Sequence, residues 1–274
     1  MNKIYLEIYL EKIIDLALQA GEIALMHFAR GKLERKKLNI SKKADQSLVT
    51  IADLEISGLI WEELTKITPK IPIICEEKRK ISLEKDAAFW LIDPIDGTNS
   101  FIDGRDEFTV NIALIKNNCP EFGLIYAPAI AGDNFFYAHA GKIFTLNIAT
   151  KLSEEFTPKK SQEKQFTIIS SKRCSHEEMS ATLKQNKFLE NLAQKNGQKE
   201  ANFLLTQQSS SLKFLSLLQG KGNCYLHLKP TMEWDIAAGH ALINAAGGKI
   251  FNLSGEEFFY QKPDFKNGGF VCFV

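Results

Sequence analysis

The chain has 274 residues, of which 45% are hydrophobic and 24% are charged, and its formal net charge is +1. This length indicates one or two domains, and the composition is that of an ordinary globular protein, which argues against intrinsic disorder and fibrous repeats. The near-neutral charge balance argues against a protein built mainly to hold long nucleic acid or an anionic membrane, although it leaves room for a local basic pocket.

The cysteines and the N-terminus indicate a cellular compartment. The five cysteines are odd in number and form no C-x-x-C pair, which favours free thiols over a disulfide framework or a zinc site. Charged residues interrupt the apolar N-terminal segment, so it does not resemble a signal peptide. No uncharged stretch reaches the ~20 residues that span a bilayer. We therefore expect a cytoplasmic protein without a transmembrane segment.

Two helices are expected at the start of the chain. Apolar residues at three- and four-residue spacings predict a helix over residues 3–30, with Gly31 as its C-cap. The basic run 32–43 is typical of a solvated loop, with a mobile flap near an anionic substrate as the alternative. A second helix is expected over residues 51–67, and Thr50 begins it with a capping box.

Strand-like runs follow the second helix. The apolar runs 71–75 and 88–92 each end next to acidic residues. Three later runs, separated by turn residues, predict sequential antiparallel strands at 108–116, 122–126 and 134–140. A Lys/Glu-rich connector at 150–165 divides the chain into an N-terminal half, 1–150, and a C-terminal half, 151–274. The second half alternates helical patterns (176–195, 211–219, 235–246) with extended ones (202–206, 223–228, 269–273), which favours an α/β arrangement.

The most informative stretch is WLIDPIDGTNSF, residues 90–101, in which an apolar strand leads to Asp93 and Asp96. Gly97 permits a tight turn, and Thr98 opens a possible helix N-terminus, where backbone N–H groups attract an anion such as phosphate. Carboxylates repel a phosphate unless a cation lies between them, and Mg²⁺ commonly bridges the two. The stretch thus predicts a metal-assisted phosphate site, with a plain surface turn as the alternative.

Other acidic residues stand in similar places. Glu76 and Glu77 directly follow the run 71–75. Asp235 stands at the expected N-cap of an Ala-rich helix, where an aspartate is usually structural but is also placed to meet a metal. Asp53 belongs to the capping box of the second helix, so the residues alone give it a structural task.

Together these segments resemble the inositol monophosphatase superfamily of Mg²⁺-dependent, lithium-sensitive phosphatases, and within it the CysQ-type 3′(2′),5′-bisphosphate nucleotidases. The segments that carry the resemblance are 43–53, 71–78, 89–102, 107–115, 123–129, 209–214 and 230–242. The resemblance implies a layered α/β (α+β) fold like that of inositol monophosphatase and fructose bisphosphatase, with alternating helix and sheet layers and the site between the two halves. Two positions depart from the family pattern: Cys75 stands where relatives usually have Gly or Ser, and Ser209 stands where many relatives have Gly.

The resemblance also implies the functions of individual residues. The ligands of Mg²⁺ would be Glu76, Asp93, the carbonyl of Ile95, Asp96 and Asp235. Gly97 and Thr98 would hold the scissile phosphate, and Asp53 with Thr98 would orient and deprotonate the attacking water. The rest of the substrate site would be formed by Ser211, Lys213 and Asp235.

The activity implied is hydrolysis of adenosine 3′,5′-bisphosphate to AMP and phosphate by a metal-activated water. Lys213 is the first candidate to contact the second phosphate, and the runner-up is the cluster Lys172, Arg173, Ser175 and His176. Two alternatives remain open: an inositol monophosphatase or sugar bisphosphatase on the same fold, or a non-catalytic nucleotide-binding sensor. The expected partner is a small phosphorylated nucleotide, and the protein is expected to be a monomer or homodimer. His240 is expected to pack rather than to bind metal.

Overall fold

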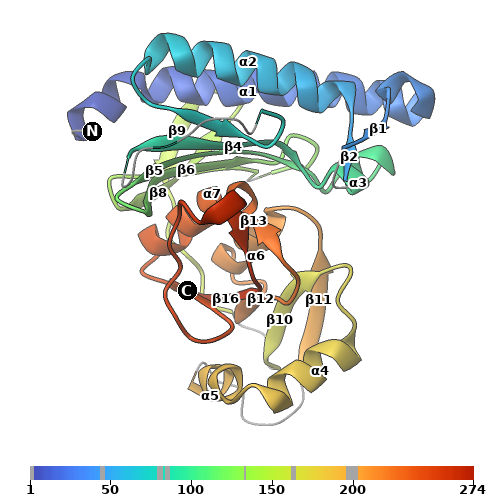
Figure 1. The fold of residues 1–274 in the computed structure, drawn as a ribbon, viewed down its shortest axis with the longest axis vertical. Coiled ribbons are helices and arrows are strands. Elements are labelled where there is room, and N and C mark those ends of the chain that lie inside the picture. Colours follow the sequence, from blue (N-terminus) through green and yellow to red (C-terminus); the bar gives the residue numbers. More distant parts are fainter. Residues whose placement is uncertain are drawn as a thin grey trace.

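The structure, a computed structural model, describes residues 3–43, 47–78, 83, 87–132, 134–161, 165–195 and 203–274. Helices and sheets alternate as layers through the molecule (Figure 1). A pair of long helices covers one face of a seven-stranded sheet, two further helices lie under its other face, and a five-stranded sheet and two last helices follow. The expected layered α/β fold is confirmed.

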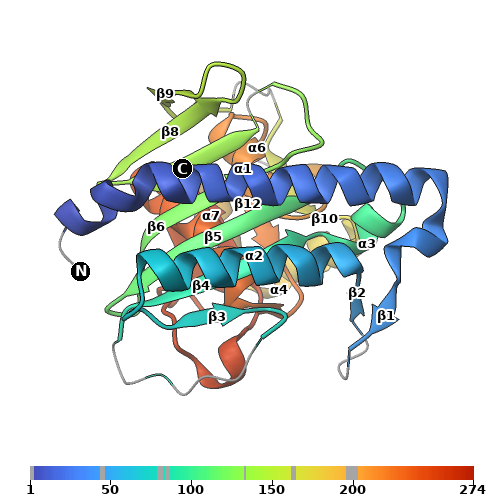
Figure 2. The same ribbon diagram turned by 90° about the horizontal axis from the view of Figure 1, so that it is seen from above.

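The outer helices are α1 (Lys3–Leu33) and α2 (Ile51–Ile67), which lie side by side across the sheet (Figure 2). The predicted bounds of α2 are confirmed, including its capping box. The predicted C-cap at Gly31 is wrong, because α1 continues to Leu33. Gly31 instead makes room for the buried Leu38, since a Cβ there would lie 2.8 Å from the Leu38 side chain.

The basic run after α1 is mostly exposed, as predicted, but it is folded. It forms a 3₁₀ turn, η1 (Arg35–Leu38), and then β1 (Ser41–Lys42), which pairs antiparallel with β2 (Leu48–Val49). The backbone N–H of Lys43 donates to the carbonyl of Ser47, which continues this pairing. Lys43 is thereby held at the rim of the sheet that carries the acidic residues.

The seven-stranded sheet has the order β3-β4-β5-β6-β7-β8-β9, and only the β3–β4 pair is parallel. Its strands are β3 (Ile73–Cys75), β4 (Phe89–Asp96), β5 (Thr109–Lys116), β6 (Cys119–Tyr126), β7 (Phe135–His139), β8 (Lys142–Asn147) and β9 (Leu152–Glu155). The predicted antiparallel run of strands is confirmed. The predicted connector is wrong at its start, because β9 pairs with β8 there. The division of the chain into two halves stays a prediction.

The inner helices are α6 (Leu212–Leu218) and α7 (Glu233–Ala245). They separate the first sheet from a five-stranded sheet of order β11-β10-β12-β16-β14. The strands of that sheet are β10 (Thr167–Ser171), β11 (Leu204–Gln208), β12 (Cys224–His227), β14 (Lys249–Asn252) and β16 (Phe270–Phe273). Short elements complete the fold: α3 (Thr98–Ile102), β13 (Thr231–Met232), η2 (Pro263–Phe265) and β15 (Lys266–Asn267).

The helices of the last layer differ from what the sequence pattern predicts. Residues 176–195 form two helices, α4 (His176–Gln185) and α5 (Lys187–Lys195), rather than one. Asn186 leaves the helical conformation between them, and its side-chain oxygen accepts the N–H of Leu189 while its side-chain nitrogen donates to the carbonyl of Leu253. Asparagine competes well for such local hydrogen bonds, which explains the break.

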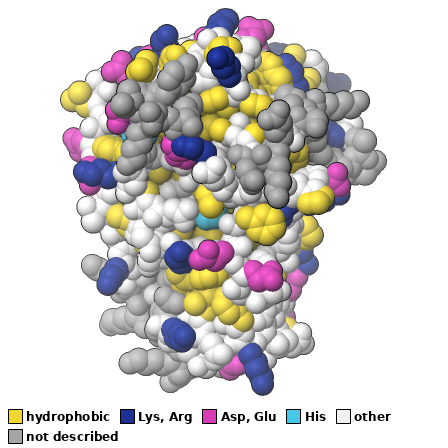
Figure 3. Space-filling model, turned by 60° about the vertical axis from the view of Figure 1, so that its left-hand side comes forward, with side chains coloured by type: hydrophobic (Ala, Val, Ile, Leu, Met, Phe, Trp, Pro, Cys, Tyr) yellow, Lys and Arg dark blue, Asp and Glu magenta, His cyan; other side chains and the backbone are white. Residues whose placement is uncertain are grey.

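Three hydrophobic clusters fill the spaces between the layers. Successive residues of β4 point to opposite faces, so Trp90 joins the cluster under α1 and α2 while Leu91 joins the cluster around α6 and α7. Among the described helices, none has both the length and the apolar character needed to cross a membrane. On the face shown in Figure 3, basic and acidic side chains are interspersed, in keeping with the near-neutral net charge.

Candidate active site

A bulge at the end of β4 brings Asp93 and Asp96 to the same side of the sheet. Residues three apart in a regular strand point to opposite faces. Here Asp93 is paired with Asn111 and Asp96 with Thr109, so β4 carries one residue more than β5 between these two pairs. Such an extra residue re-aims the side chains that follow it. Both carboxylates therefore face the same cavity.

The turn after β4 requires a glycine. Gly97 has φ of 91°, in the left-handed region, and a Cβ on it would lie 2.8 Å from the carbonyl oxygen of Glu107. Gly97 is the N-cap of α3, so the predicted helix N-terminus at Thr98 is confirmed. The Thr98 hydroxyl donates to the carbonyl of Ile95 at 3.1 Å.

Asp235 approaches the same place from α7. The predicted N-cap position is wrong, because α7 begins at Glu233 and Asp235 is its third residue. Its Oδ2 accepts the backbone N–H of Met232 at 2.7 Å, so it still caps the helix, but from inside the first turn. Glu76 directly follows β3, which pairs with β4. Its backbone N–H donates to the carbonyl of Ile92 in β4.

These residues line one cavity of about 340 Å³, here called the acidic cavity. It contains most of the predicted site residues: Glu76, Asp93, Ile95, Asp96, Gly97, Thr98, Lys213 and Asp235. Ser211 does not line it; its hydroxyl donates to Asp96 at 2.9 Å and accepts from the amide of Asn111. Ser211 thus holds a carboxylate of the cavity in place.

Asp53 also lies outside the lining and is almost fully buried. Its Oδ2 accepts from the backbone N–H and the hydroxyl of Thr50, as the capping box predicts. Burial raises its pKa to about 7, and the charges of Glu77 and Glu76 add to the shift. In the part of the chain that the structure describes, Asp53 and Thr98 share no hydrogen bond.

The carboxylates of the acidic cavity repel one another. Burial raises the pKa of Asp93 well above its usual range, and the charges of Glu76, Asp96 and Asp235 raise it further. Burial likewise raises the pKa of Asp235 and of Asp96, although Lys213 offsets part of the shift. A buried cluster of this kind is stable only with protons or cations to neutralise it.

The donor set fits a hard divalent cation. Carboxylate and carbonyl oxygens are the ligands that Mg²⁺ prefers. The Oδ1 atom of Asp93 is buried and has no hydrogen-bond partner, so it offers a lone pair to such an ion. In their present positions, the described side chains do not form a group of three or more acidic, His or Cys ligands around one point.

Basic side chains also line the acidic cavity. Lys213 is buried, its Nζ donates to the carbonyl of Ser210, and burial lowers its pKa to about 8 against the pull of Asp96 and Asp235. Of the runner-up cluster, Lys172 and Arg173 line the cavity. Ser175 instead caps α4, and His176 stacks on Phe203. The cavity thus has both acidic and basic side chains in its lining, as binding of a metal ion together with a phosphate requires.

Arg105, His227 and Asn111 are among the residues of this region that sequence reasoning missed. Arg105 and His227 line the cavity, and Asn111 holds Ser211 and Asp96. His227 stacks on Phe270, and its pKa is lowered to about 3 by burial, so it is neutral. In the sequence, these three residues are marked only by lying in or near the motifs. Their role depends on long-range contacts, such as the bond from Asn111 to Ser211, which lies 100 residues away. The prediction that His240 packs is confirmed by its contact with the Tyr260 hydroxyl.

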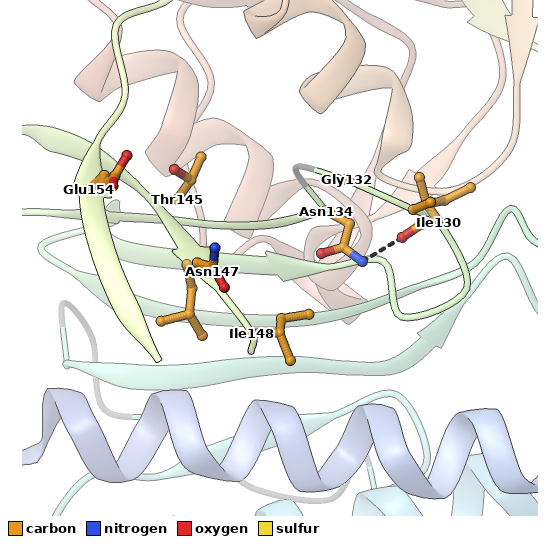
Figure 4. A pocket seen from close by; sticks show the side chains of 9 residues that line it. Ile130, Gly132, Asn134, Thr145, Asn147, Ile148 and Glu154 are labelled. Carbon is orange, nitrogen blue, oxygen red and sulfur yellow. Dashed lines mark hydrogen bonds between the residues drawn. The ribbon is translucent and has the colours of Figure 1, made fainter. Parts of the chain in front are cut away.

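A second cavity, of about 390 Å³, lies beside β8 and β9 (Figure 4). Its described lining includes one carboxylate, Glu154, and no lysine or arginine. Asn134 lies on the Ile130 side of it and donates to the carbonyl of Ile130 at 2.5 Å. This cavity lacks the cluster of acidic and basic side chains that lines the acidic cavity, so it is a weaker candidate for metal-assisted phosphate chemistry.

Comparison with known proteins identifies the family. Residues 6–269 match the description "Inositol monophosphatase family". The chain belongs to the inositol monophosphatase family. It is 33% identical over 264 residues to the 3′(2′),5′-bisphosphate nucleotidase CysQ of Salmonella typhimurium, covering 95% of this chain and 98% of that protein. The CysQ of Escherichia coli K12 is also 33% identical, over 265 residues, with the same coverage.

Solved structures agree with this assignment. The crystal structure of CysQ from Bacteroides thetaiotaomicron, a bacterial member of the inositol monophosphatase family, superimposes with a TM-score of 0.70 at 29% identity and covers 95% of each chain. An IMPase of Thermotoga maritima gives a TM-score of 0.69 at 24% identity, over 96% of this chain and 91% of that one. The protein is therefore a CysQ-like phosphatase of the inositol monophosphatase family, a metal-dependent family that acts on small phosphorylated molecules.

Proposed function

We propose that the protein hydrolyses adenosine 3′,5′-bisphosphate to AMP and phosphate, with Mg²⁺ as cofactor. The observation that carries this proposal is the acidic cavity itself, whose lining combines mutually repelling carboxylates with lysine and arginine side chains. The 33% identity to CysQ nucleotidases over nearly the whole chain supports the choice of substrate. A bisphosphate also suits a cavity that has more cationic groups than one phosphate needs.

The site residues predicted from the sequence have the following proposed tasks. Mg²⁺ would be held by Glu76, Asp93, the carbonyl of Ile95, Asp96 and Asp235. When bound, it supplies positive charge to the phosphate oxygens and activates a water. Gly97 and Thr98, at the turn into α3, orient the scissile phosphate. Asp53, whose pKa of about 7 suits proton exchange at neutral pH, accepts a proton from the nucleophilic water, which Thr98 helps to orient.

A substrate panel tests this function. Phosphate release is measured with adenosine 3′,5′-bisphosphate, inositol 1-phosphate, fructose 1,6-bisphosphate and AMP, each with Mg²⁺ and with EDTA. We expect Mg²⁺-dependent turnover with a clear preference for the first. A preference for the inositol or sugar phosphate would overturn the substrate but keep the chemistry. No turnover of any of them by folded protein would favour the nucleotide-sensor alternative.

Lys213 gives a prediction about the second phosphate. Its buried ammonium lies against Tyr225 and is electrostatically coupled to Asp96 and Asp235. Hydrogen bonds to charged groups contribute ~1.5–3 kcal/mol, so Lys213→Met should raise the KM for adenosine 3′,5′-bisphosphate about 10- to 100-fold. The KM for a simple monophosphate should change much less. Equal effects in steady-state assays with both substrates would contradict this assignment.

The acidic cavity also predicts a pH dependence of stability. Carboxylates whose pKa is raised in the folded state bind more protons there than in the unfolded chain, so they stabilise the fold at low pH and lose that effect as the pH rises. In EDTA, Tm should therefore fall as the pH rises above about 4, the usual range of a carboxyl pKa. The contribution of Asp53 is lost near its pKa of about 7, and the fall continues for Asp93 and Asp235, whose pKa values burial raises well above the usual range. Asp93→Asn should flatten this decline in thermal unfolding. A decline that is identical in the variant would contradict the prediction.

A further inference from the structure

Lys43 makes an ion-pair contact at the rim of the acidic cavity. Its Nζ lies 2.6 Å from Oε1 of Glu76 and 2.6 Å from Oε1 of Glu77. The side chains are largely withdrawn from water, with exposed fractions of 15% for Lys43, 16% for Glu76 and 5% for Glu77. Ion pairs shielded in this way are much stronger than the exposed pairs typical of a surface lysine.

The ammonium of Lys43 neutralises part of the charge of the acidic cavity. Glu76 is one of the carboxylates whose charge acts on Asp93 and Asp235. The ammonium of Lys43 lies within 2.6 Å of both carboxylates and so brings a positive charge to them from beside the β1–β2 pair.

We propose that Lys43 is an internal counter-cation of Glu76 and Glu77, and that a divalent cation reaching Glu76 must displace its ammonium. Lys43 thereby sets the affinity of the site for metal. This inference rests on the proposed function, in which Glu76 is a metal ligand. Two cations on one carboxylate repel each other at short range. Mg²⁺ also demands oxygen ligands at about 2.0–2.1 Å in near-ideal geometry, which an ammonium on the same carboxylate hinders.

Metal-binding calorimetry of the full chain tests the exchange. EDTA-stripped protein is titrated with MgCl₂ for the natural sequence and for Lys43→Met, Lys43→Arg and Lys42→Met. The neighbouring Lys42 is exposed. Lys42→Met changes the net charge by the same amount as Lys43→Met, so it is the matched control. We expect Lys43→Met to bind Mg²⁺ about tenfold more tightly, which corresponds to ~1.4 kcal/mol. Lys43→Arg, which keeps the charge, and Lys42→Met should stay near the natural affinity.

Thermal unfolding separates this mechanism from a structural one. Without metal, Lys43→Met leaves Glu77 and Glu76 without this counter-charge, so its Tm should be lower than that of the natural protein. Saturating Mg²⁺ should then raise the Tm of Lys43→Met by more than it raises the Tm of the natural protein. An unchanged or weaker Mg²⁺ affinity in Lys43→Met would overturn the proposal and assign Lys43 a structural task only. Asp93→Asn is titrated in parallel: if it binds Mg²⁺ as well as the natural protein, the proposed metal site itself fails instead.

Discussion

Asp93→Asn should lower kcat by about 10²–10³-fold or more, without loss of the folded state. Charged groups that stabilise a transition state contribute on this scale. Asp93 is buried and lines the acidic cavity, its Oδ1 has no hydrogen-bond partner, and four other carboxylates repel it. Removing its charge should weaken metal binding. It should also relieve this repulsion, so that Tm in EDTA stays equal or rises.

The combination of these two results is the diagnostic feature. Changing a core residue with a purely structural task would lower the stability of the protein. The Asp93→Asn protein should instead lose activity while its Tm is kept. Asp106→Asn is the matched control, because Asp106 is an exposed aspartate near α3 that pairs with Lys32. It should retain natural kcat and Tm. Natural turnover in Asp93→Asn, measured by phosphate release, would show that Asp93 is not part of the catalytic machinery.

Gly123→Val should destabilise the protein by about 3 kcal/mol or more, as severe overpacking does. Gly123 lies in β6 where α7 crosses the sheet, and a Cβ there would stand 2.5 Å from the carbonyl oxygen of Ala238 and 2.6 Å from Cβ of Ala241. Backbone cannot yield as a flexible side chain can. Since α7 carries Asp235 and the sheet carries Asp93, forcing them apart should also widen the acidic cavity and reduce activity.

Gly58→Ala is the contrasting variant for this prediction. Gly58 lies within α2, and a Cβ on it would meet nothing within 4 Å. Alanine is favoured over glycine inside a helix by ~1 kcal/mol, so this variant should be slightly more stable. At roughly 2–4 °C per kcal/mol, thermal unfolding should separate the two by about 8–16 °C. A Gly123→Val protein as stable as the natural one would mean that α7 and β6 do not pack this closely.

Local signals made part of the fold predictable. The bounds of α2 follow from a capping box at one end and a proline just past the other, and both act within a few residues. The antiparallel strands were predictable because turn residues separate strongly apolar runs. In contrast, β14 has one fully buried side chain among four, so its pattern is weak. Strand β9 is wholly exposed, and pairing with β8, not burial, defines it.

The candidate site was predictable where a motif carries the chemistry. Asp93, Asp96, Gly97 and Thr98 are adjacent in sequence, and the structure brings them to one cavity with Glu76 and Asp235. The bulge that aligns Asp93 with Asp96 depends on pairing with β5, which no local pattern shows.

Residues that reach the site through long-range contacts were not predictable in the same way. Lys43 belongs to a basic run, and its charge alone does not reveal that it reaches Glu76 and Glu77, which lie more than 30 residues away. Arg105 and His227 likewise enter the cavity through the packing of separate elements.

The most direct test of the central claim is to locate a metal in the acidic cavity. Crystals grown without divalent cations are soaked in MnCl₂ with phosphate, and anomalous scattering identifies the manganese, which accepts the same oxygen ligands as Mg²⁺. The account predicts an anomalous peak coordinated by Asp93, Asp96 and Asp235, with phosphate between the metal and the turn at Gly97. Manganese bound only elsewhere on the protein, with these carboxylates unoccupied, would contradict it.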